Sequence, residues 1–364
     1  MKFGSTLNKN INQSSTLDAN FYSDATAWEM VKEKVFAKSW NFIGDENELF
    51  NGTNNLYPFN YIENYLHEPL ILSKGENDVL KCLSNVCTHR GFQLVDHPKQ
   101  AKKISCQYHG RRFGLDGKME FMPEFKEAED FPRPCDHLHE LQIKKWNQFL
   151  FTSLEPSFDF QKVLDTMNEK VGLLPIKEFR YAPEFSQDYL VHANWALYCD
   201  NFLEGFHIPF VHGGLNKLLD YGKYSTTCYE HCNLQIGYSD SGVECFKLPK
   251  NHPDYGENIT AFYYWLFPNM MFNFYPWGLS INVVKPIKTD LTRVSFICYI
   301  YDEKIFEQMD AAALTDKVER EDEFVVEAVH KGLQSRFYKN GRFSPTREKG
   351  VHQFHCMLNE FLEI

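Results

Sequence analysis

Two short segments pair a cysteine with a histidine in a way that can hold a metal cluster. Cys87 and His89 have one residue between them, and Cys106 and His109 have two. Two facing loops of this kind can enclose a [2Fe–2S] cluster, with both thiolates on one iron and both imidazoles on the other. Because neutral imidazoles replace two thiolates, such a cluster has a higher reduction potential than an all-cysteine cluster.

Structural zinc is the alternative ligand for these four residues, since zinc also binds two cysteines and two histidines. Zinc fingers, however, usually pair cysteine with cysteine and histidine with histidine, whereas both segments here are mixed. A single residue between cysteine and histidine is also unusual for zinc fingers. The spacing therefore favours the iron–sulfur cluster over zinc.

A second group of possible metal ligands follows at Glu204, His207 and His212. On an ideal helix, two residues five positions apart are separated by about 140° and do not share a face. Pro209 lies between the histidines and is expected to distort or end the helix, which lets the imidazoles converge. Glu204 precedes His207 by three residues, so we expect both on one helical face. Taken alone, most such pairs of histidines are ordinary core or surface residues.

Together the two segments resemble the catalytic (alpha) subunits of Rieske non-haem iron oxygenases. The cysteine–histidine pairs are similar to the Rieske signature, and residues Asn194 to His212 are similar to the pattern around the family's mononuclear iron. The resemblance runs from Trp40 to Phe354, with the cluster segment first. It implies a Rieske [2Fe–2S] cluster and a mononuclear Fe(II) held by His207, His212 and a later carboxylate.

The later carboxylate is expected in the acidic run from Glu319 to Glu323, on the last long helix. Composition cannot choose among the four acids of this run. The family's Glu-Asp pair corresponds to Glu321 and Asp322, with the aspartate as ligand. We therefore expect Asp322 to complete a two-histidine, one-carboxylate iron site, with Glu321 as the alternative.

The resemblance implies O2-dependent hydroxylation or oxidative demethylation of a small organic substrate by a mono- or dioxygenase. Asn201 and Glu204 fall at catalytic positions of the family pattern. In the homotrimer that the family implies, Glu204 is expected to bridge His207 to the cluster ligand His109 of a neighbouring subunit.

Residues 200–210 are most similar to the branch that oxidises quaternary ammonium compounds such as choline, betaines and carnitine. Aromatic side chains further along the chain could hold such a cation by cation–π attraction. The same rings could instead line an apolar pocket for the aromatic acid of a ring-hydroxylating oxygenase, which is the alternative function. These candidates are Tyr263, Tyr264, Trp265, Phe272, Phe274, Tyr275 and Trp277.

The source of electrons is expected to lie outside this chain. No G-x-G-x-x-G follows a predicted strand, and no plant-type ferredoxin cysteine run is present. We therefore expect electrons from NAD(P)H to arrive through a separate flavin/iron–sulfur reductase or ferredoxin. Basic residues around the cluster loops form a candidate docking patch for an acidic donor. They are Lys99, Lys102, Lys103, Arg111 and Arg112.

The surrounding sequence predicts an α+β protein with an all-β unit first. We expect a helical segment over residues 1–40 that packs on the catalytic domain, a Rieske domain over 41–155 and a catalytic domain over 156–364. Turn pairs at Asn51–Gly52 and Asp116–Gly117 punctuate the β unit. Residues 158–171 and 316–332 have helical periodicity. Long apolar runs between them predict a large antiparallel sheet with covering helices of the helix-grip (START-like) type.

Composition narrows the remaining possibilities. A length of 364 residues suits two domains, and a net charge of −11 argues against nucleic acid as the main partner. The most apolar stretch is interrupted by Asn and Pro, so no membrane helix is expected. Ten cysteines without a secretion signal indicate reduced thiols or metal ligands and a cytoplasmic protein.

Two functions from other classes remain open at this point. A Rieske electron-transfer protein without oxygenase activity would lack the second metal, and a zinc-stapled binding module would be colourless.

Overall fold

The computed structural model describes residues 3–4, 6–75, 78–239 and 242–363. Its contacts divide the chain into two compact units: Ala37–Ser157 forms one, and Met1–Phe36 joins Phe158–Ile364 in the other. The predicted α+β class, with an all-β unit first and a large antiparallel sheet after it, is confirmed. The contacts put the ends of the first unit at residues 37 and 157, where the sequence analysis placed them at 41 and 155.

The smaller unit is built from two antiparallel sheets. Within the described residues, six strands follow the order β1-β9-β8-β4-β3-β2, and three short strands follow the order β5-β6-β7. A single helical turn, α2 (Glu46–Leu49), follows β1. The strands are β1 (Asn41–Asp45), β2 (Leu56–Ile62), β3 (Leu66–Lys74), β4 (Leu80–Ser84), β5 (Ile104–Ser105), β6 (Arg112–Phe113), β7 (Met119–Phe121), β8 (Glu140–Trp146) and β9 (Phe149–Ser153).

Two loops of this unit share a backbone hydrogen bond and a glycine conformation. One follows β4 and holds Cys87, and the other joins β5 to β6 and holds Cys106. In each loop a glycine N–H, of Gly91 or Gly110, donates to the cysteine carbonyl at 3.0 Å. These glycines have φ of 71° and 74°, a left-handed conformation that glycine adopts without steric cost. Both cysteine side chains belong to the buried core of the unit.

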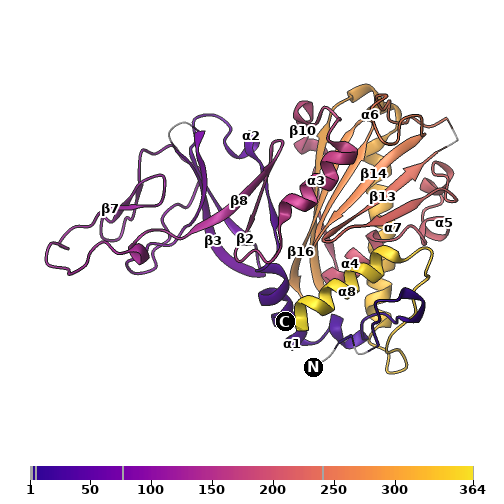
Figure 1. Ribbon diagram of the computed structural model, residues 1–364, viewed down its shortest axis with the longest axis horizontal. Helices are drawn as coiled ribbons and strands as arrows, with labels where there is room; N and C mark the ends of the chain where they lie inside the picture. The colour runs from indigo at the N-terminus through magenta and orange to yellow at the C-terminus, as the bar shows by residue number, and fades with distance from the viewer. Residues whose placement is uncertain (1–2, 5, 76–77, 240–241, 364) are drawn as a thin grey trace. The chain divides into compact units, whose positions relative to one another are not determined.

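The larger unit is organised around an antiparallel sheet of eight strands in the described residues. Seven follow the order β10-β17-β16-β15-β14-β13-β12, and β11 also pairs with β17. Figure 1 labels β13, β14 and β16 in this sheet, where β13 and β14 are neighbours and β15 lies between β14 and β16. The strands are β10 (Arg180–Tyr181), β11 (Gln187–Val191), β12 (Ser225–Cys228), β13 (Cys232–Tyr238), β14 (Ile259–Leu266), β15 (Met270–Tyr275), β16 (Gly278–Lys288) and β17 (Leu291–Ile300).

Helices pack along this sheet and against each other. The helix expected over 158–171 begins at Phe160, and the helix expected over 316–332 begins earlier, at Ala311. The leading segment is not one continuous helix, because α1 is followed by a π-helical turn over Lys32–Phe36. The helices are α1 (Ala25–Val31), α3 (Phe160–Val171), α4 (Trp195–Phe202), α5 (Ile208–Val211), α6 (Glu303–Gln308), α7 (Ala311–Gly332) and α8 (Lys349–Glu363).

The N-terminal segment is tied to the larger unit by buried hydrogen bonds. The Leu17 N–H donates to His355 Nδ1 at 3.0 Å, and the Tyr22 hydroxyl donates to Asp200 Oδ2 at 2.8 Å. His355 Nε2 lies 2.9 Å from the other Asp200 oxygen. These bonds join α4 and α8 to the first residues of the chain. None of the helices in the described ranges combines the length and apolar character needed to cross a bilayer.

Candidate active site

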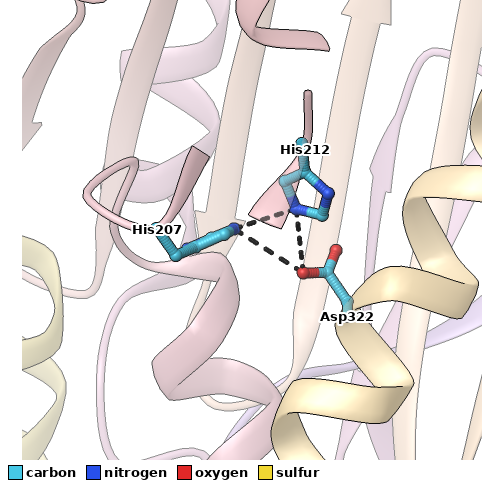
Figure 2. Close-up of side chains that lie close together, drawn as sticks. All are labelled: His207, His212 and Asp322. Atoms are coloured by element: carbon cyan, nitrogen blue, oxygen red, sulfur yellow. Dashed lines mark hydrogen bonds and ion pairs between the residues drawn. The ribbon is translucent and has the colours of Figure 1, made fainter. Parts of the chain in front are cut away.

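Two histidines and one aspartate of the larger unit converge on a single point. His207 and His212 lie at the two ends of the short helix α5, and Asp322 lies on α7. The two Nε2 atoms are 3.1 Å apart, and Asp322 Oδ1 lies 3.1 Å from His212 Nε2 and 3.6 Å from His207 Nε2. Figure 2 shows the three side chains pointing toward one another. This is the donor set of a two-histidine, one-carboxylate iron site.

Each histidine of this group has a second carboxylate behind it. Glu204 Oε1 lies 2.6 Å from His207 Nδ1, and Glu321 Oε2 lies 2.8 Å from His212 Nδ1. With Nδ1–H donating to a carboxylate, the Nε2 lone pair of each ring is left to face the convergence point. Burial alone lowers the pKa of His212, but the carboxylates of Asp322 and Glu321 outweigh burial and raise that pKa. The residues present therefore fit a divalent metal ion.

The local backbone differs from the helix expected around Pro209. Helix α4 ends at Phe202, and Pro209 lies in the first turn of α5, where its missing N–H costs nothing. Pro209 thus starts a helix, and the imidazoles converge because they flank that single turn. The expectation that Glu204 shares a helical face with His207 is wrong, because Glu204 lies in the loop between the two helices. Its carboxylate reaches His207 by accepting the backbone N–H groups of Phe206 and His207.

The four cysteine and histidine residues of the smaller unit also lie together. The Cys87 and Cys106 thiols are within hydrogen-bonding reach of each other, and both are buried. The rings of His89 and His109 are 4.8 Å apart at 77°. His109 Nδ1 is buried and has no hydrogen-bond partner among the described residues. Burial also raises the pKa of Cys87, so its thiolate needs a cation beside it. The orphaned nitrogen and buried thiols fit a metal cluster.

Arg111 does not belong to the exposed basic patch expected around these loops. Its side chain is 1% exposed, and its Nη2 donates to Asp136 Oδ1 at 2.7 Å. The guanidinium also lies over the rings of Phe113 and Phe131, at 5.8 and 5.4 Å from their centroids. Arg111 therefore forms a buried ion pair within the smaller unit. The prediction that it belongs to an exposed patch for an acidic electron donor is wrong.

A cavity of about 150 Å³ opens onto the histidine–aspartate group. Asn201, on the last turn of α4, and Glu204 both line it together with His207, His212 and Asp322. The sheet supplies the facing wall, because Gln235, Tyr263, Asn273 and Ser280 are register partners across four neighbouring strands. One face of helix α7 lines the cavity as well. Its residues there are Ala311, Leu314, Thr315, Val318, Glu319 and Asp322.

The aromatic residues singled out in the sequence fall into two groups, because successive residues of a strand face opposite sides of the sheet. Tyr263, Tyr275 and Trp277 line the cavity, with the Tyr275 and Trp277 rings stacked at 4.8 Å. Tyr264, Phe272 and Phe274 therefore lie on the other face, in the core. Trp265 packs on Phe354 at 5.2 Å instead of facing the cavity.

Several lining residues were not singled out by the sequence analysis, among them Tyr198, Tyr224 and Glu319. Tyr198 donates from its hydroxyl to Glu319 Oε2 at 2.5 Å, and burial raises the pKa of both groups well above their usual values. Glu319 was visible only as one acid of a charged run. The sequence could have indicated this position, because Glu319 precedes Asp322 by three residues and that spacing puts both on one face of α7.

Comparisons with known proteins agree with this arrangement. The chain matches the family described as ring hydroxylating alpha subunit (catalytic domain) over residues 176–364, and the Rieske [2Fe-2S] domain over residues 39–132. It is 28% identical to the carnitine monooxygenase oxygenase subunit of Escherichia coli (strain K12), over 94% of this chain and 92% of that protein. It is 27% identical to the chloroplastic choline monooxygenase of Beta vulgaris, over 96% of this chain and 77% of that protein.

Solved structures show the same fold. A quaternary ammonium Rieske monooxygenase in complex with L-carnitine superposes with a TM-score of 0.74 at 24% identity, covering 96% of each chain. Naphthalene 1,2-dioxygenase with bound indole superposes with a TM-score of 0.72 at 16% identity, covering 100% of this chain and 95% of the other.

Fold, donor sets and comparisons together define a Rieske-type non-haem iron oxygenase. Its cofactors are a Rieske [2Fe–2S] cluster and a mononuclear iron. The chain belongs to the ring-hydroxylating alpha-subunit family. This confirms the resemblance that the sequence motifs indicated.

Proposed function

We propose that this oxygenase hydroxylates or oxidatively demethylates a quaternary ammonium compound. The observation that carries the proposal is the cavity wall, where Tyr224, Tyr263, Tyr275 and Trp277 surround a space that reaches the histidine–aspartate group. Aromatic faces attract quaternary ammonium groups electrostatically. The curated relatives named above act on carnitine and choline, which supports the same substrate class.

The metal-binding roles follow from the two donor sets. His207, His212 and Asp322 hold the iron, and Glu204 and Glu321 hold the histidines in the tautomer that binds it. Bound iron leaves coordination positions open for O2 activation beside the substrate. Asn201 contributes its amide to the same cavity. In the smaller unit, the cluster ligands are Cys87, His89, Cys106 and His109.

Electrons pass between subunits in this proposal, with Glu204 as the link between His207 and His109 of a neighbouring subunit in a homotrimer. Exposed aromatic residues accompany both centres. Phe92 and Tyr108 are 38% and 54% exposed beside the cluster loops, and Phe206 and Phe210 are 40% and 80% exposed beside His207. Apolar surface of this kind suits a protein interface. A separate NAD(P)H-dependent flavin/iron–sulfur reductase or ferredoxin supplies the electrons, in the cytoplasm.

A substrate screen tests this function. The iron-loaded enzyme, supplied with NADH and a generic reductase, should consume O2 with choline, glycine betaine or carnitine and release an oxidised or demethylated product. Turnover of aromatic acids alone would replace the proposal with the ring-hydroxylating alternative. Cluster reduction without O2 consumption on any compound would favour an electron-transfer role.

A further inference from the structure

The charged groups of the cavity are all acidic. Among the described residues that line it, Glu204, Glu319 and Asp322 carry carboxylates, and there is no lysine or arginine. Glu204 is engaged with His207, and Asp322 faces both imidazoles. Glu319 is the remaining carboxylate, and the metal site makes no use of it.

The Glu319 carboxylate lines the cavity and has one unpartnered oxygen among the described residues. The side chain is buried at 2% exposure, and its Oε2 accepts the hydroxyl of Tyr198. Its Oε1 is buried and has no hydrogen-bond partner among the described residues. A buried carboxylate oxygen without a partner is costly, and a positive charge beside it offsets that cost. A quaternary ammonium group has no N–H to donate, so it would act on Glu319 through its charge.

The position of Glu319 along α7 matches where a substrate cation must lie. Asp322 is three residues further along the helix on the same face, a rise of about 4.5 Å along the helix axis. The carbon that reacts must lie beside the metal ligands. In a small quaternary ammonium compound the charged nitrogen is only a few bonds from that carbon, which places it near Glu319.

The opposite wall of the cavity offers only uncharged polar groups. Gln235, Asn273, Ser280 and Asn282 face the space from the sheet, and Asn273 Oδ1 is buried without a partner among the described residues. Amides and hydroxyls can satisfy a substrate hydroxyl. A buried substrate carboxylate, in contrast, is costly without a basic partner.

We propose that the cavity selects a cation that carries no carboxylate, such as a quaternary ammonium alcohol, and that Glu319 is its counter-charge. This proposal rests on the proposed function and narrows it. Zwitterions such as glycine betaine and carnitine, and aromatic acids, are disfavoured. A cation beside Glu319 favours the ionised carboxyl, opposing the effect of burial on its pKa.

Binding to the iron-loaded holoenzyme, measured by calorimetry, tests the proposal. The ligands are choline, its neutral carbon isostere 3,3-dimethylbutan-1-ol and glycine betaine. The wild type should bind choline at least about tenfold more tightly than either of the others. Glu319→Gln should weaken choline binding by about tenfold or more and leave binding of the neutral isostere unchanged. Glu323→Gln is the matched control, because Glu323 pairs with Arg320 on the same helix and does not line the cavity.

Equal wild-type affinity for choline and glycine betaine would overturn the proposal without any variant. The proposal would also be overturned if Glu319→Gln weakened the binding of choline and of the neutral isostere to the same extent, or weakened the binding of neither. In these cases turnover of quaternary ammonium compounds would still support the proposed function. Failure to bind or turn over any of them would reject the proposed function and this inference together.

Discussion

At the scale of single residues, the site depends on how carboxylates surround two imidazoles. Glu204 and Glu321 contact the Nδ1 atoms of His207 and His212, while Asp322 faces the Nε2 atoms. In the proposed site, these three acids have two different tasks: one completes the donor set, and two orient ligands from behind.

This division of tasks predicts different effects for neighbouring substitutions. Asp322→Ala should abolish mononuclear iron binding and turnover, because it removes a ligand, while leaving the cluster intact. Glu321→Gln should only weaken iron affinity, by about 10–100-fold, because it changes a group behind the ligand. Iron per chain, measured across a titration with Fe(II), distinguishes the two. If Glu321→Gln lost iron completely and Asp322→Ala retained it, the assignments would be reversed.

Glu204→Gln tests the proposed link between the centres. The amide oxygen can still accept from His207, so we expect the cluster spectrum to be retained. Iron affinity should weaken as in Glu321→Gln, and the site should still fill in excess Fe(II). Turnover should fall by about 100-fold, because the charge that joins the two histidines is gone. Stopped-flow reoxidation of the reduced cluster by O2 and substrate measures this step, and Glu204→Asp should recover part of the rate. An unchanged reoxidation rate in Glu204→Gln would remove Glu204 from the electron route.

The sequence, with the family resemblance, identified most of these residues and predicted ligand roles for them, but it did not predict that Glu321 contacts His212 from behind or that Glu319 lines the cavity. The spacing of Cys87, His89, Cys106 and His109 singles them out without a structure. The acidic run on α7 is different, because four neighbouring carboxylates look alike until the phase of the helix is known. Glu319 was not singled out within that run for this reason. A charged run is usually a solvated face, and it is the packing of α7 on α4 that buries Glu319.

At the scale of elements, the strands were the most predictable part. Runs such as residues 261–266 and 296–300 are apolar because most of their side chains are buried on the two faces of the large sheet, and β14 and β17 lie there. Helix ends that depend on tertiary contacts were less predictable. The turn α5 was not expected, because a proline between two histidines can equally well end a helix or start one.

The packing of α8 against the end of α4 provides a stability prediction. A Cβ on Gly350 would lie 2.3 Å from the carbonyl oxygen of Leu203, the residue before Glu204. Gly350→Ala should therefore lower the free energy of unfolding by about 1–3 kcal/mol. A Cβ on Gly332, at the end of α7, would meet nothing within 4 Å. Gly332→Ala should be neutral or stabilise by up to about 1 kcal/mol.

Urea unfolding of the two glycine variants, followed by circular dichroism, makes this comparison. Equal stability of Gly350→Ala and Gly332→Ala would show that α8 does not pack against Leu203 as described.

At the scale of the whole molecule, the chain divides between two units in a way that sequence order hides. The segment Met1–Phe36 belongs with residues after Phe158, through contacts such as Leu17 with His355. Bonds between residues more than 300 positions apart leave no local pattern in the sequence. The order of the two metal-binding segments, in contrast, was readable, because each lies within one short stretch of its own unit.

The central claim is that one chain holds a [2Fe–2S] cluster in one unit and a single iron in the other. The most direct test is the metal and sulfide content of the purified protein and of its His207→Ala variant. The wild type should contain about three irons and two acid-labile sulfides per chain, with a red-brown spectrum. His207→Ala should keep the colour and the sulfides and lose one iron. A colourless protein that contains zinc, or a variant that loses the colour, would contradict the account.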